Sequence, residues 1–487
     1  MARLSSATVA GIDRYVTIPS YDREQARVGI VHFGVGAFHR AHQAVYLDDV
    51  LAAGGSSWGV CGIGVLSGDR RIRDVLRDQD GLYTLLNVDT AGNTVARVVG
   101  SHLTHLHAPD DPQAVVDRLA DPATRIVSLT ITEGGYGISE ATGAFEPTDP
   151  ATLADLDGAQ PPTSAFGLIV AALAVRRVDK SEPFTIMSCD NIQHNGQVAR
   201  AAITAFARHL DHDLAEWIDE HVAFPSSMVD RITPATSSDV VDAVAAYGIE
   251  DGWPVRSESF TQWVLEDNFS AGRPPLDEVG VQLVDDVTPY ELMKLRLLNA
   301  SHQVMSYLGI LAGETYVHDV CRDSDFTAFL LAYMRQEAIP TLEPVPGIDL
   351  EKYCRQLIAR FSSRAILDTL ARQTVDGSDR IPKFLLPVIR AQLAAGGDIR
   401  RSTLALAAWS HYLDASLVPP GAPAPVDRRL SALRAAAAAE RHTPGAFLDH
   451  HDVFADLGQN AVLRSGFVTA RALLRGQGPR AAISLLN

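Results

Sequence analysis

The sequence predicts an α/β fold in two parts, an N-terminal Rossmann-type dinucleotide-binding domain and a largely α-helical C-terminal domain. In the first half, short apolar runs alternate with helix-like segments, which is typical of a parallel sheet covered by helices. A glycine turn follows the first of these runs. From about Pro289 onward, strand signals fade and helical stretches dominate. We therefore expect one domain over residues 1–285 and another over 286–487, with 225–285 able to belong to either.

The expected strands of the sheet are four near-continuous apolar runs, of the kind that is buried on both faces. They are residues 29–33 (GIVHF), 58–65 (WGVCGIGV), 125–132 (RIVSLTIT) and 184–192 (FTIMSCDNI). The helical spacing of Phe38, Ala41 and Val45 predicts one helix after the first run, stopped by a Gly-Gly pair. Residues 166–177 and 195–210 are further helical segments, and the alanine-rich stretch 429–442 is expected to be a structural helix.

Composition narrows the class of protein. The 487 residues carry a net charge of -17, from 42 Lys+Arg and 59 Asp+Glu. Such an acidic surface repels phosphate backbones and anionic lipid, so nucleic acid and membranes are not expected as partners. The four cysteines form no C-x-x-C pair, and no long apolar segment is present, which favours a reducing, cytoplasmic location.

The glycine turn GIVHFGVGAFHRAH places Gly34 and Gly36 after the first strand and at the start of a helix. In a dinucleotide fold the first glycine permits the tight turn, and the second lets the backbone approach a pyrophosphate. His39 stands where a third glycine is usual, so the motif by itself is weak. A turn that merely joins strand to helix is the alternative. We assign Gly34, Gly36 and the neighbouring Phe38 to the cofactor site.

The end of the second strand indicates which cofactor is bound. The run WGVCGIGVLSGDRR offers Asp69, whose carboxylate can accept from the 2′-hydroxyl of NAD and repel the 2′-phosphate of NADP. Arg70 and Arg71 follow at once, and arginine can hold that phosphate. The expectation is NAD, with NADP as the alternative.

A second cluster lies in the apolar run ELMKLRLLNASHQVMSYLGILAG. On an α-helix at about 100° per residue, Lys294, Asn299 and His302 fall within an arc of about 140°. A lysine whose pKa is lowered can take a proton from an alcohol while hydride leaves carbon, and the other two can hold the oxygen. Alternatively, these side chains satisfy neighbouring backbone. Tyr290 and Lys294 also fit Y-x-x-x-K, but the short-chain dehydrogenases that use this pair are about half as long.

Histidine-rich stretches raise the question of a metal site. HLTHLH (102–107), FHRAH (38–42) and DHHD (449–452) are the candidates. None has a carboxylate or thiolate partner in a recognised ligand spacing, so no functional metal is expected.

Several longer motifs occur in an order that resembles the polyol-specific long-chain dehydrogenases, above all the mannitol-specific members. These motifs are FGVGAFHRAHQAVY, SLTITEGGY, MSCDNIQHNG, FPSSMVDRITP, WVLEDNF, VTPYELMKLRLLNASH and DGSDRIPKF. The resemblance runs from about residue 28 into the C-terminal region. It implies a Rossmann-type domain, a helical domain, an active site between them, no metal and a monomeric enzyme.

The resemblance also implies roles for individual residues. Lys294 would be the general base, and Asn299 and His302 would stabilise the developing oxyanion. The remaining assignments are Asn191 on the reactive oxygen, Glu291 in a proton relay, Asp230, Arg372 and Arg380 at the substrate, and Glu133 on the cofactor side. Asp230 could instead pair with Arg231. Two departures matter: Arg380 replaces a lysine, which would suit an altered substrate group such as a carboxylate, and Gly68 replaces an acid that some members carry beside Asp69.

The implied function is NAD-dependent, metal-independent oxidation of D-mannitol to D-fructose, and the reverse reduction. Fructuronate reductase (D-mannonate oxidation) and D-arabinitol 4-dehydrogenase activities are alternatives within the family, because they use the same catalytic residues. A β-hydroxyacid dehydrogenase and a dinucleotide-binding sensor without turnover are more distant alternatives.

Overall fold

A computed structural model describes residues 2–139, 142–158 and 161–487. The chain divides into two compact units. Unit 1 comprises residues 1–89 and 93–288, and unit 2 comprises residues 90–92 and 289–487.

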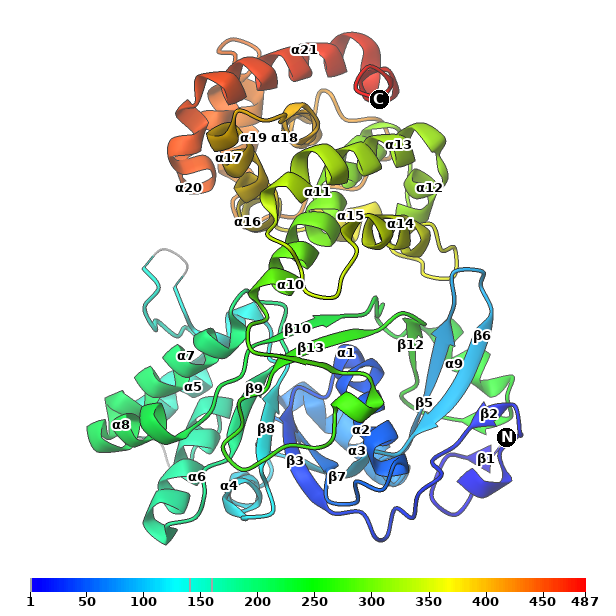
Figure 1. Ribbon diagram of the computed structural model, residues 1–487, viewed down its shortest axis with the longest axis vertical. Coiled ribbons are helices and arrows are strands. Elements are labelled where there is room, and N and C mark those ends of the chain that lie inside the picture. Colours follow the sequence, from blue (N-terminus) through cyan, green and yellow to red (C-terminus); the bar gives the residue numbers. More distant parts are fainter. Residues whose placement is uncertain (1, 140–141, 159–160) are drawn as a thin grey trace. The chain divides into compact units, whose positions relative to one another are not determined.

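Unit 1 is built around a five-stranded parallel sheet with the strand order β7-β4-β3-β8-β9 (Figure 1). Its strands are β3 (Val28–Phe33), β4 (Gly59–Gly64), β7 (His102–His107), β8 (Ile126–Leu129) and β9 (Thr185–Ser188). The chain starts at the central strand β3, moves outward to β7, and then returns to the other side of β3 at β8. This is the order of a Rossmann-type sheet, with its switch point between β3 and β8. The predicted α/β class is confirmed.

Side chains alternate between the two faces of the sheet along each strand, and both faces are apolar. Helices therefore cover both faces. Val31 and Phe33 of β3 belong to one apolar cluster, and Ile30 belongs to another on the opposite face. The helices of unit 1 are α1 (Ala37–Ala41), α2 (Gln43–Ala52), α3 (Arg70–Asp78), α4 (Pro112–Ala120), α5 (Pro150–Leu156), α6 (Ala165–Asp179), α7 (Asn195–Leu210), α8 (His212–His221) and α9 (Ser238–Ala245). Helices α4, α6, α7 and α8 supply the first cluster, and α2 supplies the second.

The expectation of one helix after the glycine turn is wrong. The backbone at His42 leaves the helical region, with φ -122° and ψ -91°, so the segment is two helices, α1 and α2. Strands β8 and β9 also end sooner than the apolar runs suggest, at Leu129 and Ser188. The residues beyond them are therefore free to form loops at the carboxyl edge of the sheet.

Three smaller sheets complete unit 1. A four-stranded sheet has the order β12-β5-β6-β2, a three-stranded sheet β10-β13-β14, and a pair β1-β11. Their strands are β1 (Ala2–Arg3), β2 (Val16–Thr17), β5 (Tyr83–Val88), β6 (Thr94–Val99), β10 (Ser227–Asp230), β11 (Ile249–Glu250), β12 (Val255–Glu258), β13 (Gln262–Glu266) and β14 (Gln282–Val284). The last strand ends at Val284, which agrees with the loss of strand signals seen in the sequence.

Unit 2 is helical. Its helices are α10 (Thr288–Met293, beginning at the unit boundary), α11 (Ala300–Leu311), α12 (Val317–Arg322), α13 (Ser324–Ala332), α14 (Leu350–Phe361), α15 (Leu370–Thr374), α16 (Gly377–Phe384), α17 (Leu386–Ala395), α18 (Arg400–Leu413), α19 (Leu430–Ala439), α20 (His451–Phe454) and α21 (Ala461–Ser484). Helix α11 is buried from Ala300 to Ile310, and α18 is buried from Arg401 to Leu413. These two packed helices form the centre of the unit.

Two π-helical turns interrupt the α-helical pattern of unit 2. One covers Lys294–Asn299 between α10 and α11, and the other covers Tyr333–Ala338 after α13. The hydroxyl of Tyr333, in the second turn, donates to the carbonyl of Arg296, in the first, at 3.1 Å. A π turn holds one more residue than an α turn and loosens the regular i→i+4 bonds. Here the second turn supplies a donor to a carbonyl of the first.

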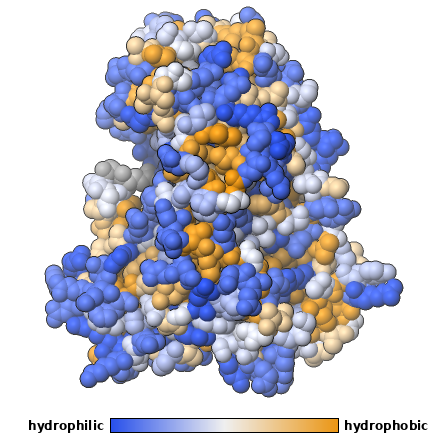
Figure 2. Space-filling view, in the orientation of Figure 1, coloured by the Kyte–Doolittle hydropathy of each residue, from blue (hydrophilic) through white to orange (hydrophobic). Residues whose placement is uncertain are grey.

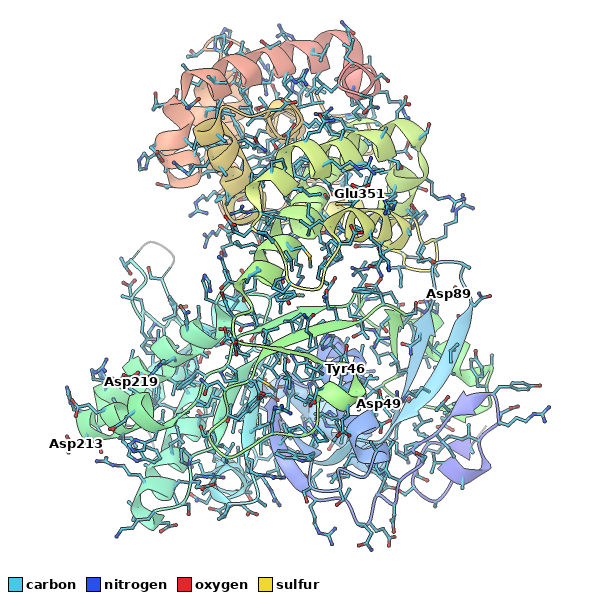
Figure 3. All side chains as sticks on the ribbon, viewed as in Figure 1. Tyr46, Asp49, Asp89, Asp213, Asp219 and Glu351 are labelled. Atoms are coloured by element: carbon cyan, nitrogen blue, oxygen red, sulfur yellow. The ribbon has the colours of Figure 1, made fainter. Side chains whose placement is uncertain are left out.

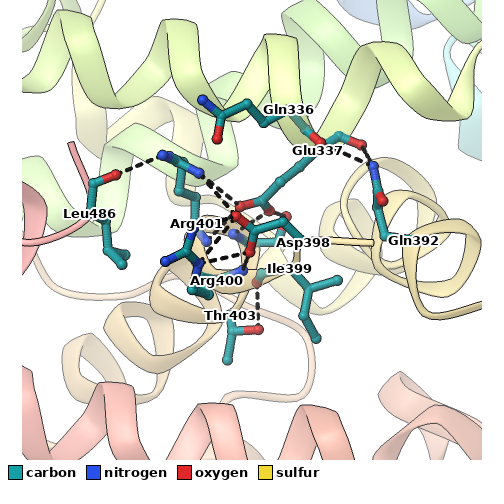
Figure 4. Close-up of polar contacts among 10 residues, drawn as sticks. Gln336, Glu337, Gln392, Asp398, Ile399, Arg400, Arg401, Thr403 and Leu486 are labelled. Carbon is teal, nitrogen blue, oxygen red and sulfur yellow. Dashed lines mark hydrogen bonds and ion pairs between the residues drawn. The ribbon is translucent and has the colours of Figure 1, made fainter. Parts of the chain in front are cut away.

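The second π turn also caps a central helix. The buried carboxylate of Glu337 accepts from the backbone amides of Arg401 at 2.7 Å and Ser402 at 2.9 Å, and from the Ser402 hydroxyl at 2.6 Å (Figure 4). These amides are among the unsatisfied donors at the start of α18. Glu337, which belongs to another helical segment, therefore caps the N-terminus of α18 and holds it against the second π turn.

One face of the molecule is mostly hydrophilic. Figure 2 shows hydrophilic residues over much of the face that it presents, with the hydrophobic residues in separate patches. Among the described helices, none has both the length and the apolar character needed to cross a bilayer.

Candidate active site

The carboxyl edge of the five-stranded sheet begins with Gly34. This residue follows β3 with φ +92°, and a Cβ atom placed on it would lie 2.1 Å from the carbonyl oxygen of Thr130. Both facts require glycine, because other residues are strained at this φ and would clash with the loop after β8. The Thr130 hydroxyl donates to the Gly34 carbonyl at 2.7 Å, which ties the two loops together at the switch point.

Gly36 is the N-cap of α1 and has an ordinary φ of -82°. A Cβ on it would meet only the Gly34 carbonyl oxygen, at 3.8 Å. Conformation therefore does not demand glycine here. The missing side chain instead leaves open space beside the backbone, as the close approach of a pyrophosphate requires. Phe38, two residues on, stacks on the ring of His42 with centroids 5.0 Å apart.

His39, at the position of the third glycine, points into the protein. Its ring stacks on that of His32, with centroids 3.4 Å apart, and its Nε2 lies 3.0 Å from Nε2 of His102. Burial lowers the pKa of all three rings, that of His32 to about 3. They are therefore neutral at physiological pH. At the position of the third glycine, the neutral rings of His39, His32 and His102 therefore pack between α1 and the sheet.

Asp69 lies in the loop after β4. Its Oδ2 accepts from the backbone amides of Val65 at 3.0 Å and Leu66 at 2.9 Å, while Oδ1 has no hydrogen-bond partner in the described part of the chain. Oδ2 thus holds the loop through two backbone amides. Arg70 forms an ion pair with Asp110, and the Arg71 guanidinium lies over the Trp253 ring, 4.7 Å from its centroid.

Glu133 and Asn191 both lie at this same edge, on the loops that follow β8 and β9, and both are exposed. Asp190, which the sequence analysis did not single out, organises these loops. Its carboxylate accepts from the amides of Ile131 at 3.1 Å and Thr132 at 2.8 Å, and from the Tyr136 hydroxyl at 2.8 Å. Burial raises the pKa of Asp190. In the sequence, the only indication of this role is that Asp190 stands between the end of β9 and Asn191.

Asp230 is the last residue of β10 and is buried. Its neighbour Arg231 donates to the carbonyl oxygens of Glu258 and Ala41 and to Oδ1 of Asn87. The guanidinium thus holds three backbone and side-chain oxygens from separate elements of unit 1.

Lys294, Asn299 and His302 lie on one continuous helix of unit 2. Lys294 is 8% exposed and His302 is 7% exposed. Lys294 opens the π turn and Asn299 closes it. The prediction of a regular α-helix is therefore wrong at this point. In an α-helix residues five apart are offset by about 140°, and the extra residue of a π turn reduces that offset. His302 follows Asn299 by three residues, about 60° away.

This face of the helix carries hydrogen-bonding capacity that the protein does not use. Asn299 Oδ1 and His302 Nε2 are buried and have no hydrogen-bond partner in the described part of the chain. Burial lowers the pKa of His302 to about 4, against the opposing charge of Asp368. His302 is therefore a neutral ring at physiological pH. Buried polar atoms without a partner are rare and indicate a ligand or ordered water. Glu291, three residues before Lys294, is also buried, at 4% exposed.

Arg372 and Arg380 lie on helices α15 and α16, which pack against α11. Asp368 fixes Arg372 through two bonds of 2.7 Å, one to Nε and one to Nη2, and also accepts from Gln373 Nε2 at 2.7 Å. Among the described residues, Arg380 makes only longer contacts, of 3.3 and 3.5 Å, to backbone carbonyls. The charges of Asp368 and both arginines act on His302. Sequence reasoning missed Asp368, which precedes the matched motif.

One group of potential metal ligands occurs among the residues described. His212, Asp213 and Glu216 offer ligand atoms within 4.8 Å of one another, and all three are exposed. Figure 3 places Asp213 at the outer end of α8. None of the three is a predicted site residue.

Comparisons with known proteins cover nearly the whole chain. Residues 28–278 match the family model described as mannitol dehydrogenase Rossmann domain, and residues 286–474 match that of the mannitol dehydrogenase C-terminal domain. A mannitol 2-dehydrogenase of Phaeosphaeria nodorum is 48% identical over 403 residues, 82% of this chain and 71% of that protein. A mannitol 2-dehydrogenase of Cereibacter sphaeroides is 42% identical over 471 residues, 96% of this chain and 98% of that protein.

Two solved structures have the same fold. The Pseudomonas fluorescens mannitol 2-dehydrogenase in ternary complex with NAD and D-mannitol superposes with a TM-score of 0.89 at 42% identity, covering 100% of this chain and 99% of that one. A D-sorbitol dehydrogenase in substrate-free form superposes with a TM-score of 0.91 at 36% identity, covering 99% of this chain and 100% of that one.

Proposed function

The chain belongs to the mannitol dehydrogenase family, and from this premise we propose that it is an NAD-dependent enzyme that oxidises D-mannitol to D-fructose and catalyses the reverse reduction. The observation that carries the proposal is the helix face of Lys294, Asn299 and His302. On that face a buried lysine is accompanied by two buried polar atoms, Asn299 Oδ1 and His302 Nε2, that lack a partner among described residues. The family relationship recognised from the sequence is confirmed.

The proposed chemistry needs one base and a held oxygen. Lys294, as the neutral amine, takes the proton of the C2 hydroxyl while the hydride on C2 passes to the nicotinamide, so that the alcohol becomes a ketone. His302 through Nε2–H and Asn299 through its Nδ2 amide donate to the oxygen as its negative charge develops, in a buried setting where such bonds are strong. Asn299 Oδ1, which has no partner among the described residues, is an acceptor and can take a hydrogen bond from a substrate hydroxyl. The neutral ring of His302 can do this without adding a second positive charge beside Lys294. In the reverse direction the Lys294 ammonium returns the proton.

The cofactor is proposed to lie at the carboxyl edge of the parallel sheet. Gly36 provides the open space for the pyrophosphate, and the free Oδ1 of Asp69 can accept from a ribose hydroxyl. When bound, NAD supplies the hydride acceptor. Phe38 and Glu133 are proposed to border the cofactor, and Asn191 to help hold the reactive oxygen.

The substrate contacts are proposed to be Asp230, Arg372 and Arg380, with Glu291 relaying the proton to solvent. Arg372 is already fixed by Asp368, whereas Arg380 has only long contacts to carbonyls. A guanidinium with this much spare capacity can also bind a carboxylate. That observation favours D-mannonate as a second candidate substrate.

A substrate panel tests the proposal. D-mannitol, D-sorbitol, D-arabinitol and D-mannonate are each offered with NAD and with NADP, and initial rates of reduced cofactor are followed at 340 nm. The expected result is the highest kcat/KM with D-mannitol and NAD. Much faster oxidation of D-mannonate would replace mannitol by the second candidate.

The Lys294→Ala variant tests the mechanism. We expect retained NAD binding and a loss of kcat of about 10²–10⁴-fold, the usual contribution of a general base. Lys352→Ala, at an exposed lysine of α14, is the matched control and should leave kcat unchanged. Unchanged turnover in Lys294→Ala would exclude lysine as the base. Absence of turnover with every polyol in the parent enzyme would favour a sensor. Activity should survive chelators, and a loss restored by zinc would overturn the metal-free mechanism.

A further inference from the structure

A charged network lies beside Asp69 at the carboxyl edge of unit 1. Strand β7 pairs with β4, and the chain after β7 reaches Asp110 three residues beyond His107. The amide of Ala108 donates to the Gly64 carbonyl at 2.8 Å, so the loops that follow the two strands start side by side. Asp110 is thus on the loop adjacent to the one that carries Asp69.

Asp110 forms ion pairs with two arginines in the first turn of α3. One carboxylate oxygen pairs with Arg70 and the other with Arg73. The ring nitrogen Nδ1 of His107 also lies 3.1 Å from Asp110 Oδ2. The side chains of Arg70, Arg73 and Asp110 are 58%, 18% and 33% exposed, so the pairs border solvent.

The same network continues to the ligand-facing loop. Nε2 of His107 contacts the Leu66 carbonyl oxygen at 3.0 Å, and the Leu66 amide donates to Asp69 Oδ2 at 2.9 Å. Asp69 and Asp110 are therefore the two ends of one chain of contacts. Arg70, the residue next to Asp69, is directed at Asp110 by its ion pair.

The two dinucleotides differ by a phosphate on the adenosine ribose. In Rossmann-type domains a carboxylate after the second strand takes the ribose hydroxyls, whereas a nearby arginine accommodates the 2′-phosphate. This chain carries both residue types side by side, at Asp69 and Arg70. An arginine whose guanidinium is paired with a carboxylate has less capacity to bind phosphate, and the carboxylate itself repels the dianion.

We propose that Asp110 is a specificity-determining residue that disfavours NADP, because it neutralises Arg70 and Arg73 and adds a negative charge beside the adenosine ribose. The proposal rests on the NAD-dependent activity given above. It differs from a role of Asp69 alone, since Asp69 is the same whether or not Arg70 is paired.

The Asp110→Asn variant tests this. It removes the charge and the ion pairs but keeps the size of the side chain. We expect kcat/KM for NADP to rise about tenfold or more, the effect of one nearby unit charge, and kcat/KM for NAD to change less than twofold. Adding Arg70→Ala should reduce the gain, because Arg70 is one of the two arginines that Asp110→Asn releases. The matched control is Asp74→Asn, which removes a partner of Arg73 and Arg77 but leaves Arg70 paired, and should not raise NADP use.

The outcomes separate the inference from the proposed function. Unchanged NADP use in Asp110→Asn with normal NAD activity overturns the inference alone. If Asp110→Asn does not fold, the parent carrying Arg70→Ala decides, because a neutralised arginine contributes nothing to NADP binding. A loss of more than fivefold in NADP kcat/KM there would overturn the inference, and no loss supports it. Absence of activity with either cofactor in the parent would instead refute the proposed function, and titration of NADPH fluorescence would still compare the variants.

Discussion

Lowering the pH from 6.5 to 5 should destabilise unit 1 far more than the rest of the chain. Unit 1 contains the buried rings of His32, His39 and His102 and the partly buried ring of His105. Burial lowers the pKa of each, to about 3 for His32 and about 4 for His105. In the unfolded chain these groups bind a proton near pH 6.5. Stability is therefore complete above pH 6.5, and falls as the pH drops from there toward the folded-state pKa values.

The size of the effect follows from the shifts. Each histidine that stays neutral while its unfolded form is protonated lowers the free energy of unfolding by about 1.4 kcal/mol per pH unit. Because the unfolded histidine is only half protonated at pH 6.5, the change between pH 6.5 and 5 is about 1.6 kcal/mol for one ring and about 6–7 kcal/mol for four. Whole domains are stable by only about 5–15 kcal/mol. In unit 2, His302 and His411 act in the same direction as these rings. Burial raises the pKa of Glu337 to about 7, so the folded protein is stabilised through this group as the pH falls, which offsets one of the two histidines. Burial also raises the pKa of Asp190, which offsets part of the loss in unit 1.

Hydrogen exchange read by mass spectrometry can follow each unit separately. Peptides from β3, β4 and β7 should lose protection steeply between pH 6.5 and 5, after correction for intrinsic exchange, while peptides from α18 change less. The His105→Leu variant should reduce the slope by about one proton, because neither ring nitrogen of His105 has a hydrogen-bond partner among the described residues and none of those bonds is lost. The exposed His212→Gln is the control. A slope of less than one proton in the parent, or no change in His105→Leu, would refute the reasoning.

Three further changes test single features. Tyr333→Phe removes the donor to the Arg296 carbonyl; unfolding should become easier by about 1–3 kcal/mol in urea titrations, and kcat should fall through misalignment of the π turn. Asp368→Asn removes the carboxylate that fixes Arg372, so KM for the polyol should rise about tenfold or more. This is the cost of losing one charge-assisted hydrogen bond, about 1.5–3 kcal/mol. NAD binding, measured by fluorescence, should be unchanged. Gly34→Ala places a methyl against backbone at positive φ, so NAD binding and thermal stability should both fall, whereas an unaltered Tm would contradict the need for glycine.

The sequence was most informative where one local pattern determined the structure. Near-continuous apolar runs identified β3, β4, β8 and β9, because strands buried on both faces have no polar side. The glycine turn was located correctly, since the need for Gly34 arises from its own φ. Helix α7 was predicted at its observed bounds, residues 195–210.

Features set by distant contacts could not be predicted in this way. Helical spacing does not reveal the break at His42 or the π turn at Lys294, because both depend on what packs against the helix. Asp190 and Asp368 act through amides and guanidinium groups that only the folded chain brings to them. The histidine-rich segments of the sequence did not indicate that the rings of His39 and His102 are hydrogen-bonded to each other. The catalytic roles of Lys294, Asn299 and His302 remain predictions that the substrate panel and the lysine variant address.

The π turn at Lys294 amounts to a one-residue insertion in a helix. Deleting Leu297 would return this segment to a regular α-helix of the same polarity and almost the same composition. Lys294 would then stand four residues before Asn299 and seven before His302, which are offsets of about 40° and 20° on an α-helix, so these side chains would stay on one face. A spacing of five residues keeps Lys294 and Asn299 together only because the turn is a π turn, since the same five residues in a regular α-helix would set them about 140° apart. The count of residues and the type of turn therefore depend on each other: a relative with one residue fewer between the lysine and the asparagine should have a regular α-helix here.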